Sequence, residues 1–235
     1  MRTFLFAVSA AAGLIAAPAA GATRNFGIED FTKVRVDGPY KVQLTSGVPP
    51  FAKAEGSQAG LDRVAVEIIG NTLVIHPNRS SWGGYPGEDV GPVVISLGTH
   101  DLVAAWVNGS GSVAIDRARG LTFDVSVQGS GAASVERADV DQLRVAVGGT
   151  GSVRIAGKAG KTSAILRGMA SFDASQLKTK DAVLSADGTA TVRAAVSGTA
   201  KIDGSGPATF ELTGGPSCTA RLSGSATVSG CGSNH

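Results

Sequence analysis

A glycine-centred motif recurs through the second half of the chain, and its spacing limits the possible folds more than any other feature. In each copy a leading glycine is followed by Ser, Thr or Met and then by Gly or Ala. Successive leading glycines are 20, 20, 19, 20, 16 and 20 residues apart. A supersecondary unit that repeats at a nearly fixed period predicts an architecture in which each unit packs on its neighbours. The leading glycines are Gly109, Gly129, Gly149, Gly168, Gly188, Gly204 and Gly224.

Apolar residues alternate with polar residues on both sides of each glycine. They occupy the positions four and two residues before it and four and six residues after it, with Gly230 as the exception. Alternation with a period of two is typical of strands that have one buried face. A strand, a bend and a second strand in every repeat predict a β-solenoid, in which stacked coils bury the face that a single coil cannot. Val127 should therefore lie between Val107 and Val147 in the core.

Two other interpretations of the glycine motif are weaker. A phosphate-binding loop requires a helix after its glycines, whereas Gly149-Thr150-Gly151 is followed by another alternating run, Ser152 to Ala156. A sandwich of hairpins also needs frequent turns, but it gives no reason for equivalent apolar positions about 20 residues apart. We therefore interpret the motif as the corner of a coil, where glycine adopts backbone angles that a Cβ disfavours.

The outward positions carry charges that should meet on neighbouring coils. Five residues after successive leading glycines stand Arg154, Asp173 and Arg193, which predicts a ladder of alternating charge. Asp124 and Arg144, five residues before theirs, should also face each other. Opposite charges on adjacent strands contribute a few tenths to about 1 kcal/mol each and help to fix the register.

The chain divides into three parts by composition. Residues 1–22 have one basic residue, an Ala-rich apolar stretch and an Ala-Gly-Ala end, which predict a secretory signal peptide. Residues 23–98 alternate over shorter runs, with a hairpin signal at Gly70-Asn71, and we expect this region to cap the solenoid of residues 99–235 within one continuous unit. No later apolar run is long enough to predict a membrane-spanning helix.

Charge and cysteine content narrow the class of protein further. Lys and Arg number 21 against 19 Asp and Glu, so the sequence gives no electrostatic reason to expect nucleic acid or an anionic membrane as partner. The two cysteines, Cys218 and Cys231, lie near the end of the chain. In an exported protein such a pair predicts a disulfide, which would fasten the C-terminal coil and fold the chain end back over it.

The order of these parts resembles a known family, the head GIN domain of exported bacterial proteins, which is labelled an auto-transporter adhesin. The resemblance lies in FTKVRVDGPYKVQLTSG, VEIIGNTLVI, VVISLGTHDLVAAWVNGSGSV and the glycine-centred coils that follow, from about Phe26 to Gly230. It implies an all-β fold, a right-handed parallel β-helix-like solenoid, and no established catalytic residues. Gly-Ser-Val stands where a corner similar to Gly-Ile-Asn is expected, which is a mild departure.

Two groups of residues are candidates for a site. Asp187 and Asp203 precede successive leading glycines, so they should stack as like charges and could hold a cation or serve a carbohydrate-active enzyme, although two solvated surface carboxylates are the simpler interpretation. Trp82, Tyr85 and Trp106 could stack on a sugar ring or a protein partner, unless the loop that holds the first two folds over Trp106.

These observations favour an exported, non-enzymatic solenoid in the periplasm or at the cell surface of a bacterium. It would serve either in adhesin-like binding of an envelope or surface protein or a glycan, or as a structural part of the envelope. The alternative is a polysaccharide lyase or hydrolase built on a β-helix. A groove with two or more convergent carboxylates would favour the enzyme. The sequence predicts no cofactor, and it indicates neither the ligand nor the oligomeric state.

Overall fold

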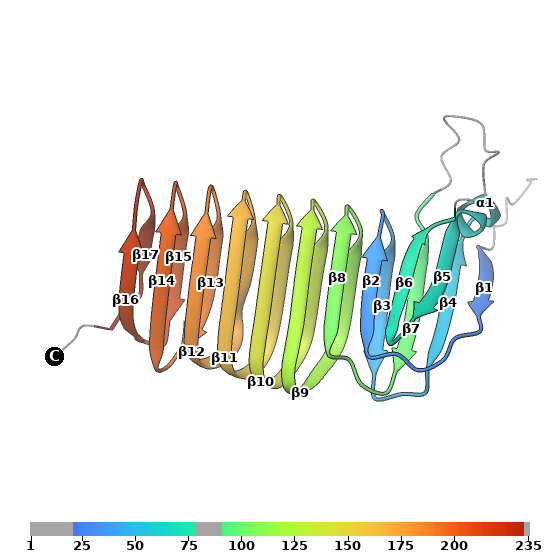
Figure 1. The fold of residues 1–235 in the computed structure, drawn as a ribbon, viewed down its shortest axis with the longest axis horizontal. Helices are drawn as coiled ribbons and strands as arrows, with labels where there is room; N and C mark the ends of the chain where they lie inside the picture. The colour runs from blue at the N-terminus through green and yellow to red at the C-terminus, as the bar shows by residue number, and fades with distance from the viewer. Residues whose placement is uncertain (1–20, 79–90, 233–235) are drawn as a thin grey trace, which may run out of the picture.

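The computed structural model describes residues 21–78 and 91–232, and it confirms the predicted fold class. The chain is 72% strand with almost no helix, and its strands form a β-solenoid. Figure 1 shows coils stacked side by side along one long axis, with the C-terminal end at one extreme. The predicted signal peptide falls on residues 1–20, outside the described residues, apart from its last two positions.

Each coil contains two strands, and the continuous 17-stranded sheet therefore doubles back into two faces. We call the face whose strands lead into the glycine corner the first face, and the face whose strands leave it the second face. The four long strands bend between corners and contribute one half to each face. They are β9 (Ser112–Gly129), β10 (Ala132–Gly149), β11 (Ser152–Gly168) and β12 (Ser171–Asp187).

Shorter strands complete both faces at either end of the stack. On the first face these are β5 (Val64–Ile69), β6 (Thr72–Pro77), β2 (Lys33–Asp37), β8 (Ala104–Gly109), β14 (Thr199–Ser205) and β16 (Ser217–Leu222). On the second face they are β1 (Ala22–Phe26), β4 (Phe51–Gly56), β7 (Val94–Thr99), β3 (Lys41–Ser46), β13 (Thr191–Val196), β15 (Thr209–Thr213) and β17 (Thr227–Ser229).

The core consists of inward columns, as the alternation predicts. Val127 pairs in register with Val107 on one side and Val147 on the other, and all three are at most 2% exposed. In the first six copies of the motif, every apolar position predicted to be inward is buried. Phe123 and Phe172 fill the wider parts of the interior. Burial of such side chains contributes about 1.5–3 kcal/mol each, which makes these columns the main source of stability.

The sixth corner lies two residues later than the sequence interpretation placed it. Gly206, with a φ of +74°, occupies the corner and lies against Gly188, the corner of the preceding coil. Gly204 instead occupies an inward position of β14 and pairs with Ala186. The last two coils are therefore 18 residues long. A shift of two residues keeps every side chain on the same face of a strand, so the inward assignments hold although the corner was misplaced.

The N-terminal region does more than cap the solenoid, because two of its segments are themselves coils. The β2–β3 coil lies between the β6–β7 coil and the coil formed by β8 and the first half of β9, with parallel pairing on both sides. Figure 1 shows the blue β2 and β3 inserted between green and teal strands. The first coil in the sequence is thus an interior coil in space. Its corner, Gly38, has a φ of +122°, as the other corners require.

The true N-terminal cap is antiparallel. Strand β5 pairs with β6 through the predicted hairpin, β4 pairs with β7, and β1 pairs with β4, all in antiparallel register. These strands and the short helix α1 (Gln58–Asp62) close the end of the stack. Antiparallel strands interrupt the parallel ladder, which protects the sheet edge from pairing with further coils.

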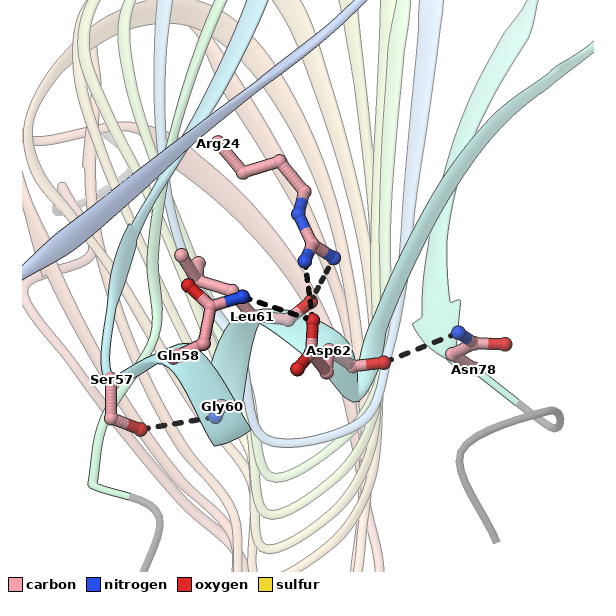
Figure 2. A network of polar contacts seen from close by, with 7 residues as sticks. All are labelled: Arg24, Ser57, Gln58, Gly60, Leu61, Asp62 and Asn78. Carbon is pink, nitrogen blue, oxygen red and sulfur yellow. Dashed lines mark hydrogen bonds and ion pairs between the residues drawn. The ribbon is translucent and has the colours of Figure 1, made fainter.

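A polar network fastens the cap (Figure 2). Arg24 of β1 donates a hydrogen bond of 2.8 Å to the backbone oxygen of Leu61 and forms an ion pair with Asp62. The hydroxyl of Ser57 accepts a hydrogen bond from the amide of Gly60, at 3.0 Å, and so caps the helix. The side-chain amide of Asn78 reaches the backbone oxygen of Asp62 at 3.2 Å. The network therefore joins β1, α1 and the residue that follows β6.

The C-terminal end is tied but remains uncovered. The predicted disulfide between Cys218 and Cys231 is present and joins β16 to the segment after β17. In this seventh copy, however, Ala220 is exposed, Leu222 is 40% exposed and Val228 is only partly buried. The expectation that the chain end covers the last coil is therefore wrong. Within residues 21–78 and 91–232, β16 and β17 pair with β14 and β15 on one side, and no strand packs on their other side.

Candidate functional site

One candidate surface is a shallow hollow on the second face, over β9 to β12. Its floor is formed by the outward positions three and five residues after each leading glycine. The first of these positions holds Ser or Ala in all four strands, and the second holds a small side chain in β9 and β10 and a charged one in β11 and β12. We call it the serine–alanine hollow. It is lined by Ser112, Ala114, Ala132, Ser134, Ser152, Arg154, Ser171 and Asp173.

Local sequence explains this hollow. The strands alternate strictly, so the residues between the buried valines must point to solvent, and small residues there leave the surface low. The register places Ala132 between Ser112 and Ser152, and Ser134 between Ala114 and Arg154. Serine hydroxyls donate and accept hydrogen bonds, and the alanine methyl groups between them allow a partner to approach the sheet closely. The arrangement is a shallow surface of hydroxyl and methyl groups on a sheet with a buried core beneath it.

A ladder of alternating charge closes one side of the hollow, and it confirms the sequence prediction. Arg154, Asp173 and Arg193 lie on adjacent strands in register, and Glu211 extends the ladder by one more coil. The guanidinium of Arg154 lies 3.3 Å from the carboxylate of Asp173, and that of Arg193 lies 2.7 Å from Glu211.

Asp173 is held in its charged form. The hydroxyl of Ser175 donates to Asp173 Oδ1 at 2.7 Å. This hydrogen bond, assisted by the Ser175 amide and by the charges of Arg154 and Arg193, holds the pKa of the Asp173 carboxyl below its ordinary value. A carboxyl with a lowered pKa carries a negative charge near neutral pH and is unsuited to donate a proton there.

The aromatic candidates are described only in part. Trp106 lies on the first face, half-buried, between Arg35 of β2 and Ser126 of β9. Trp82 and Tyr85 belong to residues 79–90, outside the described residues. The predicted aromatic site therefore stays a prediction, and Trp106 is its described member.

The expected stacking of Asp187 and Asp203 is wrong. Asp187 pairs with Ser205, whose hydroxyl donates to it at 2.7 Å, while Asp203 pairs with Ser185 and Arg221. The error follows from the misplaced sixth corner, which shifts Asp203 along its strand by two residues. Arg167 does face Asp187, as expected.

Each carboxylate therefore has a different partner, and the repulsion that a bound cation would relieve does not arise between them. Within residues 21–78 and 91–232, no three His, Cys, Asp or Glu side chains gather as a metal site would require.

The serine–alanine hollow was missed by the sequence interpretation, although its signal was present. The sequence prediction for the outward positions was based on charge, and the small outward residues of β9 and β10 carry no charge. Comparing the size of outward residues between copies would have indicated a depression that spans neighbouring coils.

Comparison with known proteins is consistent with this geometry. The model of a family described as "Putative auto-transporter adhesin, head GIN domain" matches residues 30–216. A solved structure from Bacteroides fragilis, described as a "putative adhesin", aligns with a TM-score of 0.76 and 18% identity, covering 90% of this chain and 96% of that chain. A comparison with curated proteins gave no match.

Two structures from Parabacteroides distasonis are also similar. One is described as a "putative lipid binding protein" and aligns with a TM-score of 0.71 and 16% identity, covering 89% of this chain and 96% of that chain. The other is described as a "putative adhesin" and aligns with a TM-score of 0.66 and 16% identity, covering 88% and 95%. At these identities the likeness establishes the fold alone. Among the described residues, no helix has the length and hydropathy to cross a membrane.

Proposed function

The chain belongs to the family described as "Putative auto-transporter adhesin, head GIN domain", and from that premise we propose that it is an exported, non-enzymatic binding protein of the bacterial periplasm or cell surface. In this proposal the solenoid presents a rigid outer surface to a protein or a glycan of the envelope. The serine–alanine hollow is the contact surface, and the Arg154–Asp173 pair orients the partner at its edge.

The observation that carries the proposal is the hollow itself. Four adjacent strands leave a depression of hydroxyl and methyl groups on a sheet that is fixed from beneath by buried valines. A rigid surface loses little conformational entropy when a partner binds, which favours recognition. An ordered ion pair beside a polar floor suits a ligand rich in hydroxyl or amide groups.

The enzymatic alternative has less support. The two carboxylates that the sequence brought forward are separated, with Ser205 beside one and Arg221 beside the other. The serine–alanine hollow contains one carboxylate, Asp173, whose pKa is lowered. Glycoside hydrolysis uses a pair of carboxyl groups, one of which carries a proton at working pH.

Lipid binding, which the name of one structure from Parabacteroides distasonis suggests for that protein, would here have to take place on the outer surface. The interior columns are filled, since Phe123, Phe172 and Phe210 are fully buried among aliphatic neighbours. Among the residues that the structure describes, a packed core of this kind leaves no chamber for an acyl chain.

A matched pair of substitutions in β10 tests the contact surface. Ala132→Trp would fill the serine–alanine hollow, and Ala146→Trp adds the same bulk at an outward, half-buried position on the first face. The parent protein is first screened on arrays of glycans and of purified envelope proteins, and both variants are then measured against the ligands that bind.

We expect Ala132→Trp to weaken binding by at least about tenfold, or ~1.4 kcal/mol, and Ala146→Trp to bind like the parent. Equal binding by both variants would contradict the assignment of the hollow. Loss confined to Ala146→Trp would instead place the site on the first face, near Trp106.

A further inference from the structure

A second hollow lies at the corner opposite the glycines, where each long strand bends from the second face to the first. Its lining residues stand eight to ten residues after the leading glycines. We call it the basic hollow. It is lined by Arg117, Arg119, Arg137, Ala138, Asp139, Gly157, Lys158 and Lys178.

The basic hollow concentrates positive charge from four coils. Arg119, Asp139, Lys158 and Lys178 form one column on adjacent strands, and Arg117 faces Arg137 in the neighbouring column. Five cations and one carboxylate leave a formal charge of +4 in the lining. Asp139 separates Arg119 from Lys158, but Lys158 faces Lys178 and Arg117 faces Arg137, and like charges directly opposite each other destabilise a sheet.

The protein compensates these charges only in part. Lys158 lies 3.3 Å from Asp139, and Arg137 lies 3.7 Å from Asp116. Arg117 donates a hydrogen bond of 2.8 Å to the backbone oxygen of Ser46, which holds its guanidinium in place. Within the described part of the chain, Arg119 and Lys178 have no ion-pair partner, and both side chains are exposed.

We propose that the basic hollow binds a linear acidic polysaccharide that lies along the solenoid axis. Coils follow one another at about 4.8 Å, so the column from Arg119 to Lys178 extends over roughly 14 Å. A polyuronate carries its carboxylates on a regular chain of sugar rings, and it can therefore place several charges along such a column. Ala138 and Gly157 provide a low floor between the cations.

The shape of the hollow favours a polysaccharide over a membrane surface. A concave strip at a corner of the coils accepts a narrow chain, whereas a bilayer presents a broad plane. Leu121 is 77% exposed near this corner, but interfacial binding requires an apolar face rather than one side chain. Arginine and lysine also provide the donors that carboxylates bind most strongly.

The basic hollow is independent of the serine–alanine hollow. The two surfaces occupy different positions in each coil and share no lining residue. Failure of one assignment therefore leaves the other intact, and the two sets of variants distinguish them.

The test measures binding of oligogalacturonates of increasing length by calorimetry at low and moderate salt. In the test variant Arg119, Lys158 and Lys178 are all changed to Gln. The matched control changes Lys41, Lys201 and Arg221 to Gln, which removes the same charge at exposed positions away from the hollow.

We expect the parent to bind with an affinity that rises with oligomer length and falls with salt. The test variant should lose at least about tenfold in affinity, and the control should lose less than about twofold. Vesicles with anionic lipid serve as the competing probe, and the parent should not bind them under the same conditions.

Three results would overturn the proposal. The first is an absence of oligogalacturonate binding by the parent at low salt. The second is an equal loss in the test and control variants, which would indicate attraction by overall charge alone. The third is binding to anionic vesicles that the test variant loses, because the hollow would then serve a membrane surface. Circular dichroism of each variant establishes that the fold is retained.

Discussion

The two ends of the stack solve the problem of termination in different ways. At the N-terminal end, β4 and β5 run antiparallel to the neighbouring coil strands, β1 runs antiparallel to β4, and the Arg24–Asp62 ion pair fastens β1 to α1. At the C-terminal end, β16 and β17 remain parallel to their neighbours, and a disulfide ties them. The first end buries its last coil and the second does not. In this molecule a change of strand direction covers the core at the N-terminal end, whereas the disulfide ties the final described coil without covering it.

The largest difference in folding stability should appear when the same substitution is made at equivalent positions of an interior coil and of the C-terminal coil. Val147 and Leu222 both stand two residues before a leading glycine, yet Val147 is 2% exposed and Leu222 is 40% exposed. Val147→Asp would bury an unpaired charge and should cost more than about 4 kcal/mol. Leu222→Asp should cost about 1–2 kcal/mol, because only part of the side chain leaves an apolar environment.

Thermal or urea denaturation measures the loss of stability in each of the two variants. A Val147→Asp protein that melts like the parent would contradict the inward assignment. Equal losses in the two variants would contradict the description of the C-terminal end as uncovered.

Removal of the disulfide should have the next largest effect. Cys218 and Cys231 are 13 residues apart in the sequence, and closing a loop of that length stabilises a protein by roughly 3 kcal/mol in the chain-entropy model. The double change to Ser should release the C-terminal coil while the N-terminal cap stays folded. Limited proteolysis followed by mass spectrometry locates the first cleavage, and cuts that begin instead near β1 would contradict this expectation.

A glycine corner in the middle of the stack should tolerate a side chain less well than a glycine in the open. Gly149 has a φ of +91°, and a Cβ there would lie 2.7 Å from the backbone oxygen of Gly129. Gly149→Ala should therefore cost about 1–3 kcal/mol. Gly27→Ala is the control, since nothing lies within 4 Å of the added Cβ and the backbone is not left-handed. Similar melting temperatures for the two variants would remove the steric explanation of the corners.

The smallest predicted effect depends on pH and concerns an interior coil. The lowered pKa of Asp173 stabilises the folded state above the unfolded pKa of about 3.9, and this contribution is lost as pH falls through the folded-state pKa. Asp173→Asn should therefore lower stability by less than about 1 kcal/mol at neutral pH. The difference should disappear in acid, and a difference that grows as pH falls would have the wrong sign.

The sequence predicts the core better than the order of the coils. Alternation alone identifies Val127, Phe172 and the other inward residues, because alternate side chains of a strand lie on opposite faces and only one set of them is apolar. The same pattern surrounds Gly38, with Val36 before it and Val42 after it. Its place between two later coils was missed, however, because the choice of stacking neighbour depends on contacts far apart in the chain.

The candidate sites were harder to predict for a related reason. Gly204-Ser205-Gly206 offers two possible corners, and both preserve the alternation, so Asp203 was aligned with the wrong neighbour. The basic hollow was missed because Arg119 and Lys178 lie about ten residues from their glycines, beyond the positions compared between copies. Outward positions carry no hydrophobic signal to fix their register. A site that spans several coils therefore becomes visible only when the stacking is known.

The central claim is that the molecule is one continuous stack, in which β2 and β3 form an interior coil, closed at the N-terminal end and open at the C-terminal end. Native-state hydrogen exchange, read segment by segment by mass spectrometry, tests it most directly. We predict that amides of β2 and β3 exchange as slowly as those of β9 to β12, and that amides of β16 and β17 exchange fastest among the coils. Exchange in β2 and β3 as fast as in β16 and β17 would contradict the account, as would a C-terminal coil as protected as the centre.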